Sequence, residues 1–314
     1  MAHAENPPVI FCRPALWVVA SIAWIGVLPA VHAAPERAGA WLENLNTSAS
    51  VSASWVENAS RTSFVPTRKD AAIYEFDAGI SQHRQLSGSW LLNASGDASY
   101  TSEPAFDRNS NLKLGPTLGL QHKFGLGALA PVLLFDATLT YKSARIAADT
   151  GWTAEAGLRL SKRLLPELKV AASGRWLEHY AKSSTFDLQQ RTVALEATWD
   201  INENWQLGGT ASWLQGRVVA NAAWSVWSQA IGGGLGQTVF NYYNSIPWEV
   251  TDSYGPKWVS YNVEARANLL SLTLARKLDA QTNLELRYAS AYVVNHIDIR
   301  YPTDSWGLAL THRF

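Results

Sequence analysis

The chain has 314 residues, and its 26 lysine and arginine residues balance its 26 aspartate and glutamate residues, so the formal net charge at pH 7 is zero. No basic excess is available to neutralise phosphates, which argues against a nucleic-acid partner. Although 47% of the residues are hydrophobic, no segment after residue 33 approaches the roughly 20 apolar residues of a membrane-spanning helix.

Residues 1–33 have the pattern of a secretory signal peptide. An apolar run, Ala15–Leu28, is followed by small residues that predict cleavage near Ala33. Cleavage there would remove Cys12, the single cysteine of the sequence, so the mature chain would have no thiol for disulfides, catalysis or metal binding. The alternative is an uncleaved anchor. Residues 34–44 are then a short lead-in.

Apolar and polar residues alternate almost without interruption over residues 45–314. Such a period of two predicts strands with one apolar and one polar face. The sequence therefore predicts an all-β domain over residues 45–314. About twelve segments have the pattern, and they cover residues 47–55, 72–81, 85–100, 112–124, 133–142, 152–161, 168–176, 192–200, 205–213, 263–274, 284–292 and 306–314.

The segment 263–274 changes phase. Val263, Ala265, Ala267 and Leu269 occupy odd positions, whereas Leu270, Leu272 and Leu274 occupy even ones. A β-bulge near Leu269 is expected to absorb the extra residue.

The connections between these segments alternate in length. Short links lie near 82–85, 125–131, 164–167, 201–204 and 278–282, and mostly longer links lie at 57–70, 101–110, 144–149, 181–186, 219–257 and 294–304. Short periplasmic turns and longer extracellular loops are typical of transmembrane antiparallel β-barrels. With both ends of the domain on the short-turn side the strand number must be even, and twelve segments satisfy this.

The last segment adds a second indication. Trp306, Leu308, Leu310 and Phe314 share one face, and the chain ends on the aromatic ring; His312 interrupts the apolar series. In this the chain resembles the outer-membrane β-barrel proteins of Gram-negative bacteria. The resemblance implies location in the outer membrane, contact with its lipid and lipopolysaccharide, and recognition of the final strand by the barrel assembly machinery. A soluble secreted β-sandwich or barrel, the alternative, would alternate in the same way.

If the apolar faces meet lipid, the polar faces line the interior. The interior then carries both signs of charge, and residues expected to line it include Glu155, Arg159, Arg175, Glu196, Glu285 and Arg287. These side chains would either orient a passing solute or form a structural lattice of ion pairs that closes the barrel.

The long loop 219–257 is the candidate binding or constriction element. Between Arg217 and Glu249 it contains no charged residue, and it concentrates aromatic side chains at Trp224, Trp227, Tyr242, Tyr243 and Trp248. The spacing of Trp224, Trp227 and Ile231 predicts a short helix, and a run of glycines follows as a hinge. The loop would form a constriction, a stacking platform for a sugar or aromatic ligand, or a self-packed cap over the rim.

Enzymatic chemistry has little support in the sequence. His179 near Asp187, and His296 near Asp298 and Asp304, are the histidine–carboxylate neighbourhoods at the outer strand ends, but neither forms a recognisable hydrolase motif. No metal-binding or cofactor-binding motif is found.

Three functions follow from the sequence. The first is an outer-membrane channel for the uptake or export of small polar solutes, with saccharides suggested by the aromatic loop. The second is a structural, anchoring or assembly-related barrel without an open pore. The third is an outer-membrane hydrolase.

Overall fold

A computed structural model describes residues 45–314 of the chain. The expected signal peptide, its cleavage site and the lead-in lie outside these residues. Within them, no helix has both the length and the apolar content needed to cross a membrane.

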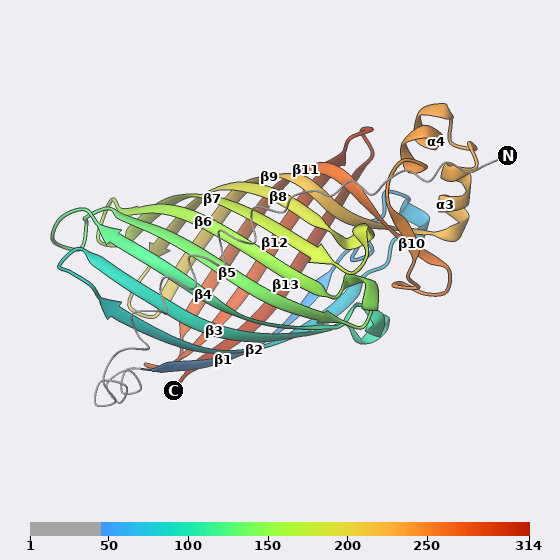
Figure 1. Ribbon diagram of the computed structural model, residues 1–314. Helices are drawn as coiled ribbons and strands as arrows, with labels where there is room; N and C mark the ends of the chain where they lie inside the picture. Colours follow the sequence, from blue (N-terminus) through green and yellow to red (C-terminus); the bar gives the residue numbers. More distant parts are fainter. Residues whose placement is uncertain (1–44) are drawn as a thin grey trace, which may run out of the picture.

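The described residues form a closed antiparallel barrel of twelve strands (Figure 1). The barrel strands are β1 (Asn46–Val56), β2 (Ala71–Gln85), β3 (Trp90–Ser102), β4 (Asn111–Lys123), β5 (Val132–Ala144), β6 (Gly151–Arg163), β7 (Leu168–Ala181), β8 (Leu188–Asp200), β9 (Trp205–Ala223), β11 (Trp258–Lys277), β12 (Thr282–Asn295) and β13 (Arg300–Arg313). Each pairs with its neighbour in the chain, and β13 closes the ring on β1 with Trp306 opposite Trp55. The predicted fold class is confirmed.

The two faces of the wall differ as the alternation predicts. Large apolar side chains such as Phe76, Leu195 and Leu308 are exposed on the outer face. Charged residues such as Arg159 and Glu196 occupy the opposite, inner face, where they pair across an intervening strand. Within the barrel wall, closure gives every described strand a hydrogen-bonded neighbour on both sides, which a lipid environment requires.

The connections are short at one end of the barrel and more elaborate at the other. The long-loop end carries four short 3-10 helices and a cap of two α-helices, namely η1 (Val65–Thr67), η2 (Pro104–Asn109), η3 (Ala147–Asp149), η4 (Ser184–Phe186), α3 (Trp224–Ile231) and α4 (Gln237–Tyr243). Figure 1 shows α3 and α4 beyond this end, opposite the end where the C terminus lies. The expected loop 294–304 is shorter than predicted, because β12 ends at Asn295 and β13 starts at Arg300.

Strands β9 and β11 continue beyond the rim as a two-stranded ribbon. The ladder between β8 and β9 stops at the pair Gln190–Gly216, but pairing between β9 and β11 continues to the pair Ala223–Trp258. A short strand, β10 (Trp248–Val250), pairs with the free side of this extension. The ribbon is the base on which the cap is built.

The β-bulge expected near Leu269 is absent, and that prediction is wrong. Residues 258–276 of β11 pair with β9 without a break in register. The alternation changes phase for another reason: along β11 the apolar residues lie on the outer face in one part of the strand and on the inner face in the other. Leu270 and Leu272 are exposed on the outer face, whereas Leu269 and Ala267 belong to an apolar cluster on the inner face.

Candidate functional site

One sector of the inner wall, on β5 to β8, is a lattice of ion pairs. Arg159 lies 2.5 Å from Glu196, and Arg175 lies 2.8 Å from Glu155 and 3.5 Å from Asp136. Four of the predicted lining residues are therefore brought together here. Glu285 and Arg287 form a separate pair at 2.5 Å on β12.

A second sector, on β2 and β3, carries carboxylates without cations. Glu75, Asp77 and Asp97 face the interior and form no ion pair within residues 45–314, although Ser50 donates a hydrogen bond of 2.8 Å to Asp77 and Ser95 one of 2.9 Å to Asp97. One sector of the lumen therefore holds paired charges of both signs and another holds carboxylates alone, a distribution that the sequence alone did not reveal.

A third sector is apolar and lies towards the long-loop end. Ala265, Ala267, Val293 and Tyr301 form a buried cluster on the inner face of β11, β12 and β13, with Leu214, Val218 and Leu269 against it. The lumen is therefore not uniformly polar, contrary to what alternation alone suggests.

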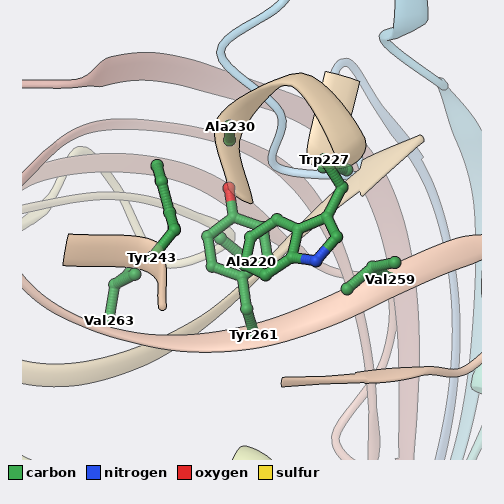
Figure 2. Close-up of a cluster of buried hydrophobic side chains, with 8 residues drawn as sticks. Ala220, Trp227, Ala230, Tyr243, Val259, Tyr261 and Val263 are labelled. Carbon is green, nitrogen blue, oxygen red and sulfur yellow. The ribbon is translucent and has the colours of Figure 1, made fainter. Parts of the chain in front are cut away.

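The cap packs on one face of the β9–β11 ribbon. This face carries small and aromatic side chains, and α3 and α4 cover it with Trp227 and Tyr243. The indole of Trp227 stacks on the ring of Tyr261 (Figure 2), and the two ring centroids lie 4.8 Å apart. Burial raises the pKa of Tyr243 to about 12, which keeps its hydroxyl protonated at neutral pH.

The five aromatic residues singled out in the loop have different environments. Trp227 and Tyr243 are 1% and 4% exposed, and Tyr242 is half-buried. Trp224 and Trp248 are 38% and 37% exposed and lie at the margin of the cluster. The expected helix from Trp224 to Ile231 is confirmed, and the glycine-rich segment after it leads into α4.

The other face of the ribbon joins the loops around the mouth of the barrel through polar contacts. Asn221 accepts a hydrogen bond of 2.7 Å from Ser260 and donates one of 3.2 Å to the carbonyl of Ser60. The turn after β10 adds Tyr254, whose hydroxyl donates 2.7 Å to the carbonyl of Ala59. Sequence reasoning missed these contacts, because they join residues of different loops and follow no motif.

A cavity of about 340 Å³ lies against this face of the ribbon, with Asn221, Tyr254 and Ser260 in its lining. Its lining combines charged side chains such as Glu103 and Lys142, amides such as Asn111 and Asn221, and apolar side chains such as Phe186. A second cavity of about 300 Å³ at the short-turn end is lined by Lys123, Arg159, Arg163 and Lys169, among others. The interior is therefore hollow at both ends.

The two histidine neighbourhoods are arranged differently from the expectation. His179 is buried, and its Nε2 lies 3.4 Å from Asp149 rather than beside Asp187, which instead accepts from the backbone nitrogen of Ala181. His296 lies beside the ring of Tyr242. Residues 45–314 contain no group of three or more potential metal ligands.

The final strand has the geometry that its sequence predicts. Trp306, Leu308 and Leu310 are exposed on the outer face of β13, and the backbone nitrogen of Phe314 donates to the carbonyl of Thr47 on β1. The role of this strand as an assembly signal stays a prediction.

Comparison with known proteins places the fold. No family model matches the chain, and no curated protein matches it. Among solved structures, an outer-membrane channel from Pseudomonas putida F1 is similar with a TM-score of 0.55 and 11% identity, over 86% of this chain and 96% of the other. The NanC porin has a TM-score of 0.42 with 8% identity over 84% of this chain and 98% of the other, and the KdgM porin 0.37 with 7% over 84% and 99%. The first of these likenesses shows that the chain has the fold of an outer-membrane β-barrel channel.

Proposed function

We propose that this protein is an outer-membrane channel for small polar solutes, with its extracellular mouth covered by the loop 219–257. The observation that carries the proposal is the inner wall. Ion pairs in one sector and carboxylates without cations in another line a hollow interior, with cavities of about 340 Å³ and 300 Å³ at its two ends. A barrel of twelve strands lies between small barrels that are filled by side chains and large porins with an aqueous channel, so a narrow polar passage is consistent with its size.

The aromatic loop has a specific part in this proposal. Trp227 and Tyr243 anchor the cap to the ribbon, and the cap in turn positions the turn at residues 251–257 over the mouth. The constriction is therefore formed by polar groups of that turn, such as Tyr254, rather than by the indoles. Trp224 and Trp248 remain partly exposed and are available to contact a solute at the cap surface.

Single-channel conductance in a planar bilayer tests the channel function. The matched variant replaces residues 252–256 by a short glycine–serine linker, which removes the contact of Tyr254 with Ala59 but keeps the ribbon. We expect current from both proteins, with larger conductance in the variant. Silence in both, with folding verified by heat-modifiable migration on a gel, would contradict a channel and favour a structural or anchoring barrel.

We also propose that the last strand directs assembly into the outer membrane. Deletion of Phe314 removes an exposed aromatic side chain and the backbone hydrogen bond to Thr47. The deletion should lower the amount of folded barrel in the outer membrane, whereas Phe314→Tyr should not. Equal amounts for the deletion and the intact chain would show that assembly does not depend on the terminal ring.

A further inference from the structure

The cavity beneath the mouth contains buried polar atoms without partners. Within residues 45–314, seven side-chain nitrogen or oxygen atoms are buried and lack a hydrogen bond, and three of the residues concerned, Glu103, Asn111 and Thr303, line this one cavity. A buried acceptor left unsatisfied costs about 1–3 kcal/mol, so such atoms are rare unless something else binds them. Their concentration in one place indicates a site shaped for a ligand.

We infer that this cavity binds a small, neutral, hydroxyl-rich solute, that is, a saccharide or polyol. The inference rests on the proposed channel function, of which it names the substrate class. It is carried by the unpartnered oxygen atoms and by the mixed charges around them.

Glu103 is the centre of the site. It lies just after β3, it is only 5% exposed, and it lines the cavity. Its Oε2 accepts a hydrogen bond of 3.0 Å from Asn109 Nδ2, whereas Oε1 has no partner. The carboxylate is therefore fixed by one oxygen, and the other is a buried acceptor in the wall of the cavity whose hydrogen bond is not made.

Asn111 and Thr303 extend the site across the lumen. Asn111 begins β4, and its Nδ2 donates to the carbonyl of Asn109, which leaves Oδ1 unpaired. Thr303 lies on β13 with its hydroxyl also unpaired. A ligand with several hydroxyl groups can donate to Glu103 and Asn111 and exchange a hydrogen bond with Thr303.

The surrounding charges select against a charged ligand. Arg61, Arg108 and Lys142 line the same cavity as Glu103 and Asp149, and each cation has a carboxylate near it, since Arg108 lies 4.0 Å from Asp252 and the charge of Arg61 acts on Glu103. Lys142 is already paired with Asp149 at 2.5 Å. A neutral hydroxyl can donate to a carboxylate and accept from a cation at the same time, so it satisfies both kinds of group without bringing a charge into the cavity.

Apolar side chains complete the lining. Ile73, Ile146, Phe186 and Val218 lie on the cavity wall beside the polar groups. A pocket that combines apolar walls with a few directed polar groups is the usual form of a small-molecule site. The C–H faces of a sugar ring match the apolar part, and its hydroxyls match the polar part.

Calorimetric titration of the detergent-solubilised full chain with maltose tests the inference. Glu103→Gln keeps the shape, but Asn109 retains the Gln oxygen as its acceptor, so an amide donor faces the cavity. A sugar hydroxyl can turn and accept from this donor, and we expect affinity within a few-fold of the original. Glu103→Leu removes the polar partner, and we expect at least a tenfold loss. Asn111→Leu should also weaken binding, whereas Asp77→Asn, on the same inner face outside the cavity, should not.

The outcomes separate the ligand classes and the two proposals. Equal, severe loss in Glu103→Gln and Glu103→Leu, or binding of ethanolamine in preference to maltose, would overturn the saccharide class in favour of a cationic donor. No maltose binding by a protein that conducts ions would overturn the binding site and leave the channel intact. Maltose binding without conductance would instead contradict the channel function. Heat-modifiable migration verifies folding of each variant.

Discussion

Replacement of Trp227 by alanine should release the cap without opening the barrel. The indole is 1% exposed and lies with ring centroids 4.8 Å from Tyr261, 5.1 Å from Tyr243 and 5.4 Å from Trp248. Truncation of a tryptophan buried to this degree costs about 3–5 kcal/mol. Helices α3 and α4 have only 8 and 7 residues, too few to be stable in water without packing, so this loss falls on the cap as a whole.

A loss of about 4 kcal/mol raises the fraction of open cap by roughly a thousandfold, since each 1.4 kcal/mol is a factor of ten. Limited proteolysis with chymotrypsin measures this fraction directly, because cleavage follows the population of the open form when opening is fast. We expect fast cleavage within residues 224–257 in Trp227→Ala, while the barrel keeps its heat-modifiable migration.

Trp224→Ala is the matched control. It is the same substitution in the same helix, but Trp224 is 38% exposed, so the cost should be nearer 1 kcal/mol. Equal cleavage of the two variants, or loss of barrel migration in Trp227→Ala, would refute the view that the cap is a separately stabilised unit held by the buried indole.

Three further predictions concern the lumen, the mouth and the ribbon. Arg175→Ala leaves Asp136 and Glu155 without their cation, and the reversal potential in a salt gradient should shift towards cation selectivity; Arg300→Ala, an exposed rim cation, should cause no shift. Burial raises the pKa of Glu103 above its ordinary value of 4.5, so the folded mouth favours the protonated carboxyl group. The stability of the folded mouth should therefore fall as the pH rises through this raised pKa. Hydrogen exchange of the 251–257 amides, corrected for intrinsic rates, should show this pH dependence in the original chain and not in Glu103→Gln; the same dependence in both would contradict it. Gly216 has φ +145°, and a Cβ there would meet the carbonyl oxygen of Gln189. Gly216→Ala should therefore lower stability by about 1–3 kcal/mol and increase proteolysis of the cap. Gly174→Ala is the control and should not increase it, because a Cβ at Gly174 meets nothing within 4 Å.

The barrel could be predicted from the sequence because its wall has an apolar outer face towards lipid and a polar inner face towards the lumen. Residues such as Val51 and Trp55 face outward and the serines between them face inward, so the chain alternates with the period of a strand. The helix at Trp224–Ile231 could be predicted for the same reason, as its apolar residues follow the helical period. Closure through β1 and β13 follows from the even strand number and the need to satisfy every strand edge.

The mouth could not be predicted, for three physical reasons. Residues 218–223 contain a single polar side chain, Asn221, among apolar ones, so they carry little alternation, and the sequence did not indicate that β9 extends to pair with residues 258–263. The hydrogen bond from Asn221 to Ser60 joins residues 161 positions apart, and no local pattern encodes it. The unpaired oxygen of Glu103 is a property of packing, and the sequence shows only an acidic residue before a proline.

Strand β11 shows where the membrane ends. Towards the short-turn end, its outer face carries the exposed side chains of Leu270 and Leu272. Towards the long-loop end, the same face carries exposed Glu264, Arg266 and Asn268. Lipid requires an apolar outer face and water a polar one, so the outer boundary of the bilayer lies near residues 268–270. The cap is therefore surrounded by water, and its aromatic cluster is stabilised by the hydrophobic effect as in a soluble protein. In lipid, the same cluster would gain no stability from the hydrophobic effect. The free-energy cost of Trp227→Ala can therefore be taken from substitutions in soluble proteins, and measuring it also tests where the bilayer ends.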